Sequence, residues 1–100
     1  MATTPSRTLA VILHADVVGS TTLVQKDETL AHARFQAAFQ RLANATEAYG
    51  GIAHEIRGDA LVAEFSRASD AVCAALAFQI ENTDHNQNLA DNIRPDLRLK

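Results

Sequence analysis

Two aspartates, Asp16 and Asp59, are the residues of this sequence best placed for metal chemistry. Asp16 directly follows an apolar run at residues 9–15, and Asp59 lies between two alternating runs at residues 52–57 and 60–65. If the first and third runs are neighbouring antiparallel strands, the end of one lies beside the start of the other, and the two carboxylates come close together. Neighbouring carboxylates repel, and a divalent cation relieves the repulsion. Oxygen ligands of this kind favour Mg²⁺ or Mn²⁺.

A short polar loop follows the first aspartate. Val17, Val18, Gly19, Ser20 and Thr21 lie where a strand would turn into a helix, and backbone N–H groups at a helix N-terminus can hold phosphate oxygens. No G-x-x-x-x-G-K-[ST] segment occurs in the chain, so this is not a P-loop. The metal pair and the loop together indicate an enzyme that acts on a nucleoside triphosphate without a Walker lysine.

Apolar periodicity predicts the elements that position these residues. The near-continuous apolar run at 9–15 predicts a buried strand. Apolar residues recur with helical spacing from Phe35 to Tyr49, Asp27 and Glu28 suit the start of this helix, and Gly50 and Gly51 follow its end. A long helix is therefore expected between the first strand and the hairpin.

The hairpin and the second helix follow. Gly58 and Asp59 fit a two-residue type II′ turn, and we expect Ile52, His54 and Ile56 to share the face formed by Leu61, Ala63 and Phe65. Ser66 or Ser69 should cap a second helix. Its expected apolar stripe consists of Ala71, Val72, Ala75, Leu76, Gln79 and Ile80, and Cys73 is expected in the core. Residues 82–92 have the composition of a loop, and 97–100 begin an alternating strand.

The order of elements is β-α-β-β-α-β, which predicts an α+β fold of the ferredoxin-like type. An antiparallel sheet would carry both helices on one face. Residues 1–7 are polar and are expected to be flexible. Because the last strand stops within an alternating run, we expect the C-terminal part of the domain to be missing.

Composition excludes several classes of partner. The chain is 47% hydrophobic and 21% charged, so it is not a disordered tail. Its net charge is −3 with scattered basic residues, and Phe65 is the only aromatic residue on an expected strand, which argues against a nucleic-acid-binding module. No apolar run is long enough for membrane insertion, and a single Cys73 excludes an intrachain disulfide. We expect a cytoplasmic protein.

Two segments resemble the signatures of the class III adenylate/guanylate cyclase catalytic domain. Residues 13–21, with the sequence LHADVVGST, look like the first signature. Gly50–Gly51 followed by residues 55–65, EIRGDALVAEF, looks like the second, and the alanine-rich helix at 70–79 continues the pattern. The resemblance covers residues 8–100, which would be the N-terminal portion of such a domain.

The resemblance implies a reaction and a set of site residues. The family converts ATP or GTP into a 3′,5′-cyclic nucleotide and pyrophosphate, with two Mg²⁺ or Mn²⁺ ions held by aspartates that match Asp16 and Asp59 and by the carbonyl that matches Val17. Its sites form between two domains, which implies a head-to-tail homodimer. Glu55 stands where adenylate-type members usually carry a lysine, as in guanylate-type members, and would read the base.

Two features leave the function open at this stage. The family's transition-state Asn and Arg come from elements beyond Lys100, and His14 replaces an aromatic residue that is common in the first signature. The alternative is a catalytically inactive cyclase-like module for dimerisation or regulation. Two facing carboxylates at Asp16 and Asp59 argue against it, because a scaffold has no need of them.

Overall fold

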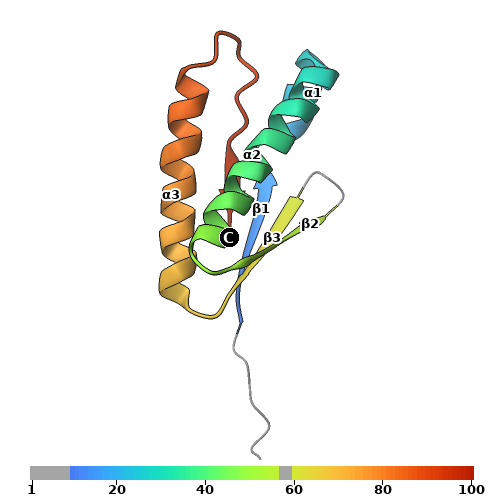
Figure 1. Ribbon diagram of the computed structural model, residues 1–100. Helices are drawn as coiled ribbons and strands as arrows, with labels where there is room; N and C mark the ends of the chain where they lie inside the picture. The colour runs from blue at the N-terminus through green and yellow to red at the C-terminus, as the bar shows by residue number, and fades with distance from the viewer. Residues whose placement is uncertain (1–9, 57–59) are drawn as a thin grey trace, which may run out of the picture.

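A computed structural model describes residues 10–56 and 60–100 of the chain (Figure 1). The strands form a four-stranded antiparallel sheet in the order β2-β3-β1-β4, and helices α2 and α3 cover one face of it. The predicted α+β class, the antiparallel sheet and the succession of strands are confirmed. The expected flexible residues 1–7 and the turn at Gly58–Asp59 lie outside the described residues.

Strand β1, Val11–Val17, alternates between the two faces of the sheet. Ala15 and Val17 are buried beneath the helices, whereas Ile12 and His14 are exposed on the opposite, open face. The prediction of a fully buried strand that ends before Asp16 was therefore wrong. In the part of the chain that the structure describes, helices cover one face of this sheet, and the strand continues through Asp16 to Val17.

The segment after β1 contains a helix that the sequence did not separate from the next one. Helix α1, Ser20–Lys26, begins after Gly19, whose φ of 64° lies in the left-handed region that favours glycine. Asp27 then caps α2, Glu28–Ala48, by accepting a hydrogen bond from the Leu30 N–H at 3.0 Å. Helix α2 buries the predicted stripe that includes Phe35, Phe39 and Leu42, and it ends before Gly50, as expected.

The hairpin strands β2, Ile52–Ile56, and β3, Ala60–Phe65, are confirmed, but β2 faces the other way from the prediction. Ala53 and Glu55 pair with Ala63 and Leu61 on the helix-covered side, and Ile52 is 58% exposed on the open face. Gly51 explains this orientation. A Cβ at Gly51 would lie 2.6 Å from Cε1 of the Phe65 ring, so this residue faces the core, and every second residue after it does the same.

Helix α3, Ala68–Gln87, differs from the prediction in its length, its cap and its buried face. Its cap is Arg67, without a side-chain hydrogen bond, rather than Ser66 or Ser69. The buried residues are Ala71, Ala74, Phe78, Asn82 and Asn86, whereas Val72, Cys73, Leu76 and Ile80 are exposed. The buried face of α3 thus combines two alanines with one phenylalanine and two asparagines, and the larger aliphatic side chains lie outside it.

Strand β4, Leu97–Leu99, pairs antiparallel with β1, with Arg98 opposite Asp16. The pairing continues to Lys100, which exchanges two backbone hydrogen bonds of 2.9 Å with His14. The segment at 93–95 packs Ile93 and Pro95 into the interior before the strand begins. The predicted final strand is confirmed, and the Asn-rich stretch before it is helical as far as Gln87.

Candidate active site

Asp16 lies near the end of β1 on the open face of the sheet. Its neighbours Ala15 and Val17 are buried on the helix side, so the side chain of Asp16 points the other way. Its Cα partners are Ala60 on β3 and Arg98 on β4. The next residue before Ala60 is Asp59, which lies outside the described residues. The closeness of Asp16 and Asp59 therefore stays a prediction.

One oxygen of Asp16 has an unusual environment. The Oδ1 atom is shielded from solvent and accepts no hydrogen bond from the described residues. The Arg98 Nε lies 3.5 Å away, within range of an ion pair but without hydrogen-bond geometry. Both side chains remain partly exposed, so this pair stabilises the fold little. A shielded, unsatisfied carboxylate oxygen is well suited to bind a hard cation.

Within the described residues, Asp16 is not part of a group of three or more His, Cys, Asp or Glu side chains that could hold a metal ion. A site at Asp16 would therefore need Asp59, a backbone oxygen and ligand oxygens to complete it. Mg²⁺ commonly binds with only one or two carboxylates plus phosphate oxygens and water, so the residues present fit such an ion.

The backbone of Val17 is oriented towards β3. His14 directs its N–H and C=O at β4, and the two backbone groups alternate direction along an antiparallel strand. By that alternation Val17 directs its carbonyl to the β3 side, one position beyond the Asp16–Ala60 pair. This direction is compatible with the predicted role of the Val17 carbonyl as a metal ligand beside Asp59.

Fewer residues of the predicted phosphate loop have an available backbone N–H donor than the sequence suggested. The Val18 N–H donates a 2.8 Å hydrogen bond to the carbonyl of Asp96 and is already paired. The first intrahelical bond of α1 runs from the Leu23 N–H to the Gly19 carbonyl, so the helix start leaves the N–H groups of residues 19–22 without an intrahelical partner. Of the predicted phosphate-binding residues, Gly19, Ser20 and Thr21 are in this set.

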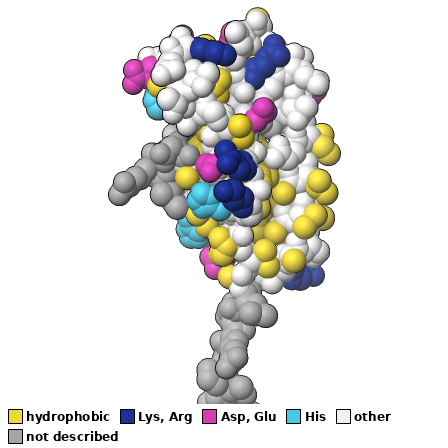
Figure 2. Space-filling model, turned by 180° about the vertical axis from the view of Figure 1, so that it is seen from behind, with side chains coloured by type: hydrophobic (Ala, Val, Ile, Leu, Met, Phe, Trp, Pro, Cys, Tyr) yellow, Lys and Arg dark blue, Asp and Glu magenta, His cyan; other side chains and the backbone are white. Residues whose placement is uncertain are grey.

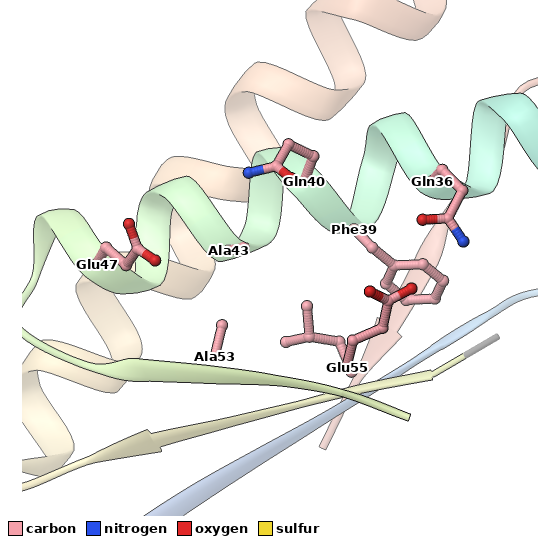
Figure 3. A pocket seen from close by; sticks show the side chains of 8 residues that line it. Gln36, Phe39, Gln40, Ala43, Glu47, Ala53 and Glu55 are labelled. Carbon is pink, nitrogen blue, oxygen red and sulfur yellow. The ribbon is translucent and has the colours of Figure 1, made fainter. Parts of the chain in front are cut away.

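Glu55 lies away from Asp16, on the helix-covered side of edge strand β2. It lines a cavity of about 220 Å³ between α2 and β2, with Phe39 and Leu61 among its apolar walls. Figure 3 shows the Glu55 carboxylate directed towards Phe39 and Gln36, and the Glu47 carboxylate on another turn of α2. The structure therefore does not bring Glu55 and Asp16 together on one face of a single chain.

The open face of the sheet carries charged and imidazole side chains (Figure 2). His54 Nε2 lies 3.5 Å from Glu64 Oε2, and His14 is on the neighbouring side of Val62. Apolar side chains gather along one side of this view. On α3, Val72 and Leu76 are exposed. None of the helices in residues 10–56 and 60–100 combines the length and apolarity that a membrane span requires.

Sequence reasoning missed two residues at this site, Arg98 and Asp96. Both come from the segment around β4, which was interpreted only as an unfinished strand. Leu97 and Leu99 alternate with Arg98, so Arg98 lies on the face opposite the two leucines. This alternation could have predicted that Arg98 lies on the open face of the sheet. The role of the Asp96 carbonyl had no signal in the sequence, because any residue supplies a carbonyl.

Comparisons with known proteins identify the fold. No family model matches the sequence, and no curated protein sequence matches it. Among solved structures, a bacterial light-regulated adenylyl cyclase matches over 90% of this chain with a TM-score of 0.81 at 20% identity. The guanylyl cyclase Cya2 matches over 90% of this chain with a TM-score of 0.69 at 18% identity.

The adenylyl cyclase CyaB from P. aeruginosa also matches over 90% of this chain, with a TM-score of 0.65 at 17% identity. The matched region is 28% of the light-regulated enzyme, 51% of Cya2 and 53% of CyaB. The chain therefore spans between about a quarter and about half of these proteins. It has the fold of part of a class III adenylyl/guanylyl cyclase catalytic domain.

Proposed function

We propose that this chain forms part of a nucleotidyl cyclase, which converts ATP or GTP into a 3′,5′-cyclic nucleotide and pyrophosphate. In this reaction the ribose 3′-oxygen attacks the α-phosphorus, the bond to the β-phosphate bridging oxygen breaks, pyrophosphate leaves and the hydroxyl proton is released. The single observation that carries the proposal is the shielded Oδ1 of Asp16, which has no hydrogen-bond donor among the described residues. The fold shared with adenylyl and guanylyl cyclases supports it.

The proposed division of labour follows the geometry. Asp16 and Asp59, with the Val17 carbonyl, would hold two Mg²⁺ or Mn²⁺ ions. Divalent ions bound there would neutralise phosphate charge and ease ionisation of the 3′-hydroxyl. The N–H groups from Gly19 to Thr21 would orient the triphosphate.

The separation of Glu55 from Asp16 favours a shared site. If Glu55 reads the base of a nucleotide held at Asp16, it must do so from a second protomer, as a head-to-tail homodimer provides. The guanylyl cyclase domain of the RhoGC fusion protein from Blastocladiella emersonii has been solved as a non-canonical dimer and as a monomer, so these structures do not distinguish between arrangements. A carboxylate at this position would accept hydrogen bonds from guanine N1–H and N2–H₂.

The alternative, an inactive dimerisation or regulatory module, is supported by one observation. Arg98 already lies beside Asp16 and could neutralise its charge without any ion. The two functions differ in whether a divalent cation displaces this pairing.

The decisive experiment incubates the full-length protein that contains this chain with Mn²⁺ and either ATP or GTP, and identifies the product by chromatography. Formation of a cyclic nucleotide, abolished in Asp16→Asn and Asp59→Asn variants that still fold, is the expected result. A folded, dimeric protein that binds no Mn²⁺ and forms no cyclic product would establish the inactive module instead.

A further inference from the structure

The three residues before and within the start of β4 are held from both sides. The carbonyls of Pro95 and Leu97 accept hydrogen bonds from side chains of α3, whereas the carbonyl of Asp96 accepts one from the Val18 N–H at the end of β1. Carbonyls of an extended chain point alternately to its two sides, which explains this pattern. Side chains of α3 thus occupy the edge where a further strand would otherwise pair.

The α3 contacts come mainly from two buried amides. Asn82, 1% exposed, donates to the Pro95 carbonyl at 3.0 Å, and Asn86, 7% exposed, donates to the same carbonyl at 3.0 Å. Asn86 also donates to Asp96 Oδ1 at 3.3 Å. Because a carbonyl can only accept, both amides must present their NH₂ groups to this segment.

The Oδ1 atoms of the two amides differ in their hydrogen-bond partners. Asn82 Oδ1 accepts from Arg41 Nη2 at 2.8 Å, so its amide plane is fixed by α2. Asn86 Oδ1 is buried and has no donor among the described residues. An unsatisfied buried oxygen lowers stability, so the Asn86 Oδ1 atom does not explain why an asparagine is placed here. The stabilising contacts of Asn86 are those of its NH₂ group.

The opposite side of the same segment sets the geometry at Asp16. With Asp96 beside Val18, the register places Arg98 opposite Asp16 and Leu97 opposite Val17. A shift of two residues would leave the same faces buried but would place a different residue opposite Asp16. The hydrophobic pattern alone does not exclude that shift. The Asn82 and Asn86 amides exclude it, because both donate to the Pro95 carbonyl and so hold Pro95 beside these two residues of α3.

We propose that Asn82 and Asn86 are positioning residues, which hold residues 95–97 so that Val18 is fixed and Asp16 keeps its place. The metal and phosphate roles of the positioned segment rest on the function proposed above. The hold on the segment itself rests only on the hydrogen bonds described here.

The test measures amide hydrogen exchange by NMR on the full 100-residue chain. Asn82→Asp keeps the acceptor for Arg41 but removes the donor to Pro95. Asn86→Leu removes both hydrogen bonds that the Asn86 NH₂ group donates and keeps the number of side-chain heavy atoms. Asn88→Ala is the matched control, because Asn88 caps the C-terminus of the same helix and its NH₂ group donates to the Asp84 carbonyl at 2.9 Å rather than to residues 95–97. In either positioning variant the Val18 amide should exchange about tenfold faster, the effect of one lost hydrogen bond, while the β2 and β3 amides are unchanged.

A second measurement is the Mn²⁺ dissociation constant, which should rise at least threefold in both variants and stay constant in Asn88→Ala. Uniform acceleration of all strand amides, or a Val18 change no larger than in the control, would overturn the proposal, because the amides would then be only structural. If Asp16→Asn leaves Mn²⁺ binding unchanged, the proposed function fails, and the Val18 exchange rate still decides whether the amides hold the segment.

Discussion

Arg98 and Asp16 should have opposite effects on metal binding. A divalent ion on the Asp16 carboxylate would lie roughly 5 Å from the Arg98 guanidinium, given the Nε to Oδ1 distance of 3.5 Å. In a water-like dielectric, a charge of two and a charge of one at that separation repel by about 1.5 kcal/mol, or about tenfold in affinity. Because Arg98 is half-exposed and can turn aside, we expect Arg98→Gln to tighten Mn²⁺ binding about three- to tenfold.

Mn²⁺ titration followed by electron paramagnetic resonance at low ionic strength measures this effect, and added salt should diminish it by screening. Asp16→Asn should weaken binding by at least tenfold and leave the melting temperature nearly unchanged, since its pair with Arg98 is partly exposed. Arg94→Gln is the control, because Arg94 contacts the carbonyls of Leu89 and Asp91 instead. Equal Mn²⁺ affinities in Arg98→Gln, Asp16→Asn and the wild type would refute the assignment of a cation to Asp16.

Three further predictions concern other parts of the chain. Gly51→Ala should lower the free energy of unfolding by about 1–3 kcal/mol in urea titration, because the new methyl group would lie 2.6 Å from the buried Phe65 ring; an unchanged midpoint would mean that the ring can move. The hydrogen bond from Arg34 lowers the pKa of Asp91, so the ionised pair stabilises the fold at neutral pH. This stabilisation is lost as the pH falls below the ordinary Asp range and the carboxylate becomes protonated. The difference in melting temperature between the wild type and Asp91→Asn should therefore persist at pH 7 and vanish in acid. In the full-length protein, Glu55→Lys should shift the kcat/KM ratio towards ATP, and a constant ratio would show that Glu55 does not read the base.

The order of strands and the place of Asp16 were accessible from the sequence, because both depend on strong local patterns. Helical periodicity marks α2, and the Gly50–Gly51 pair marks its end. The antiparallel pairing of β1 with β3 follows from the order of elements. The order places the end of β1 beside the start of β3, but it did not reveal that Asp16 lies within β1, opposite Ala60.

The orientation of α3 was not accessible, because alanine is compatible with either face of a helix. Val72, Leu76 and Ile80 form the more hydrophobic stripe and are nevertheless exposed, whereas Ala74 is fully buried. The face that α3 buries includes Phe78, Asn82 and Asn86 as well as alanines, so a pattern of hydrophobicity does not single it out.

The same limit explains the end of α3. Asn82 and Asn86 have the composition of a loop, and their helical conformation depends on partners at Pro95 and Arg41 that are distant in the sequence. Asparagine disfavours a helix interior by competing for backbone hydrogen bonds, and buried tertiary contacts outweigh that preference here. Local propensity therefore predicts that α3 ends before residue 82, although it extends to Gln87.

The amide contacts of α3 also bear on the order in which the chain folds. Strand β4 must find β1 across some eighty residues, a closure with a high entropic cost. Asn86 reaches Pro95 across nine residues and Asn82 reaches it across thirteen, so these contacts close much shorter loops. Once α3 has formed, these contacts align β4 beside it. The unit of α3 and β4 can then dock onto the sheet in one step, so that β4 does not have to pair with β1 independently.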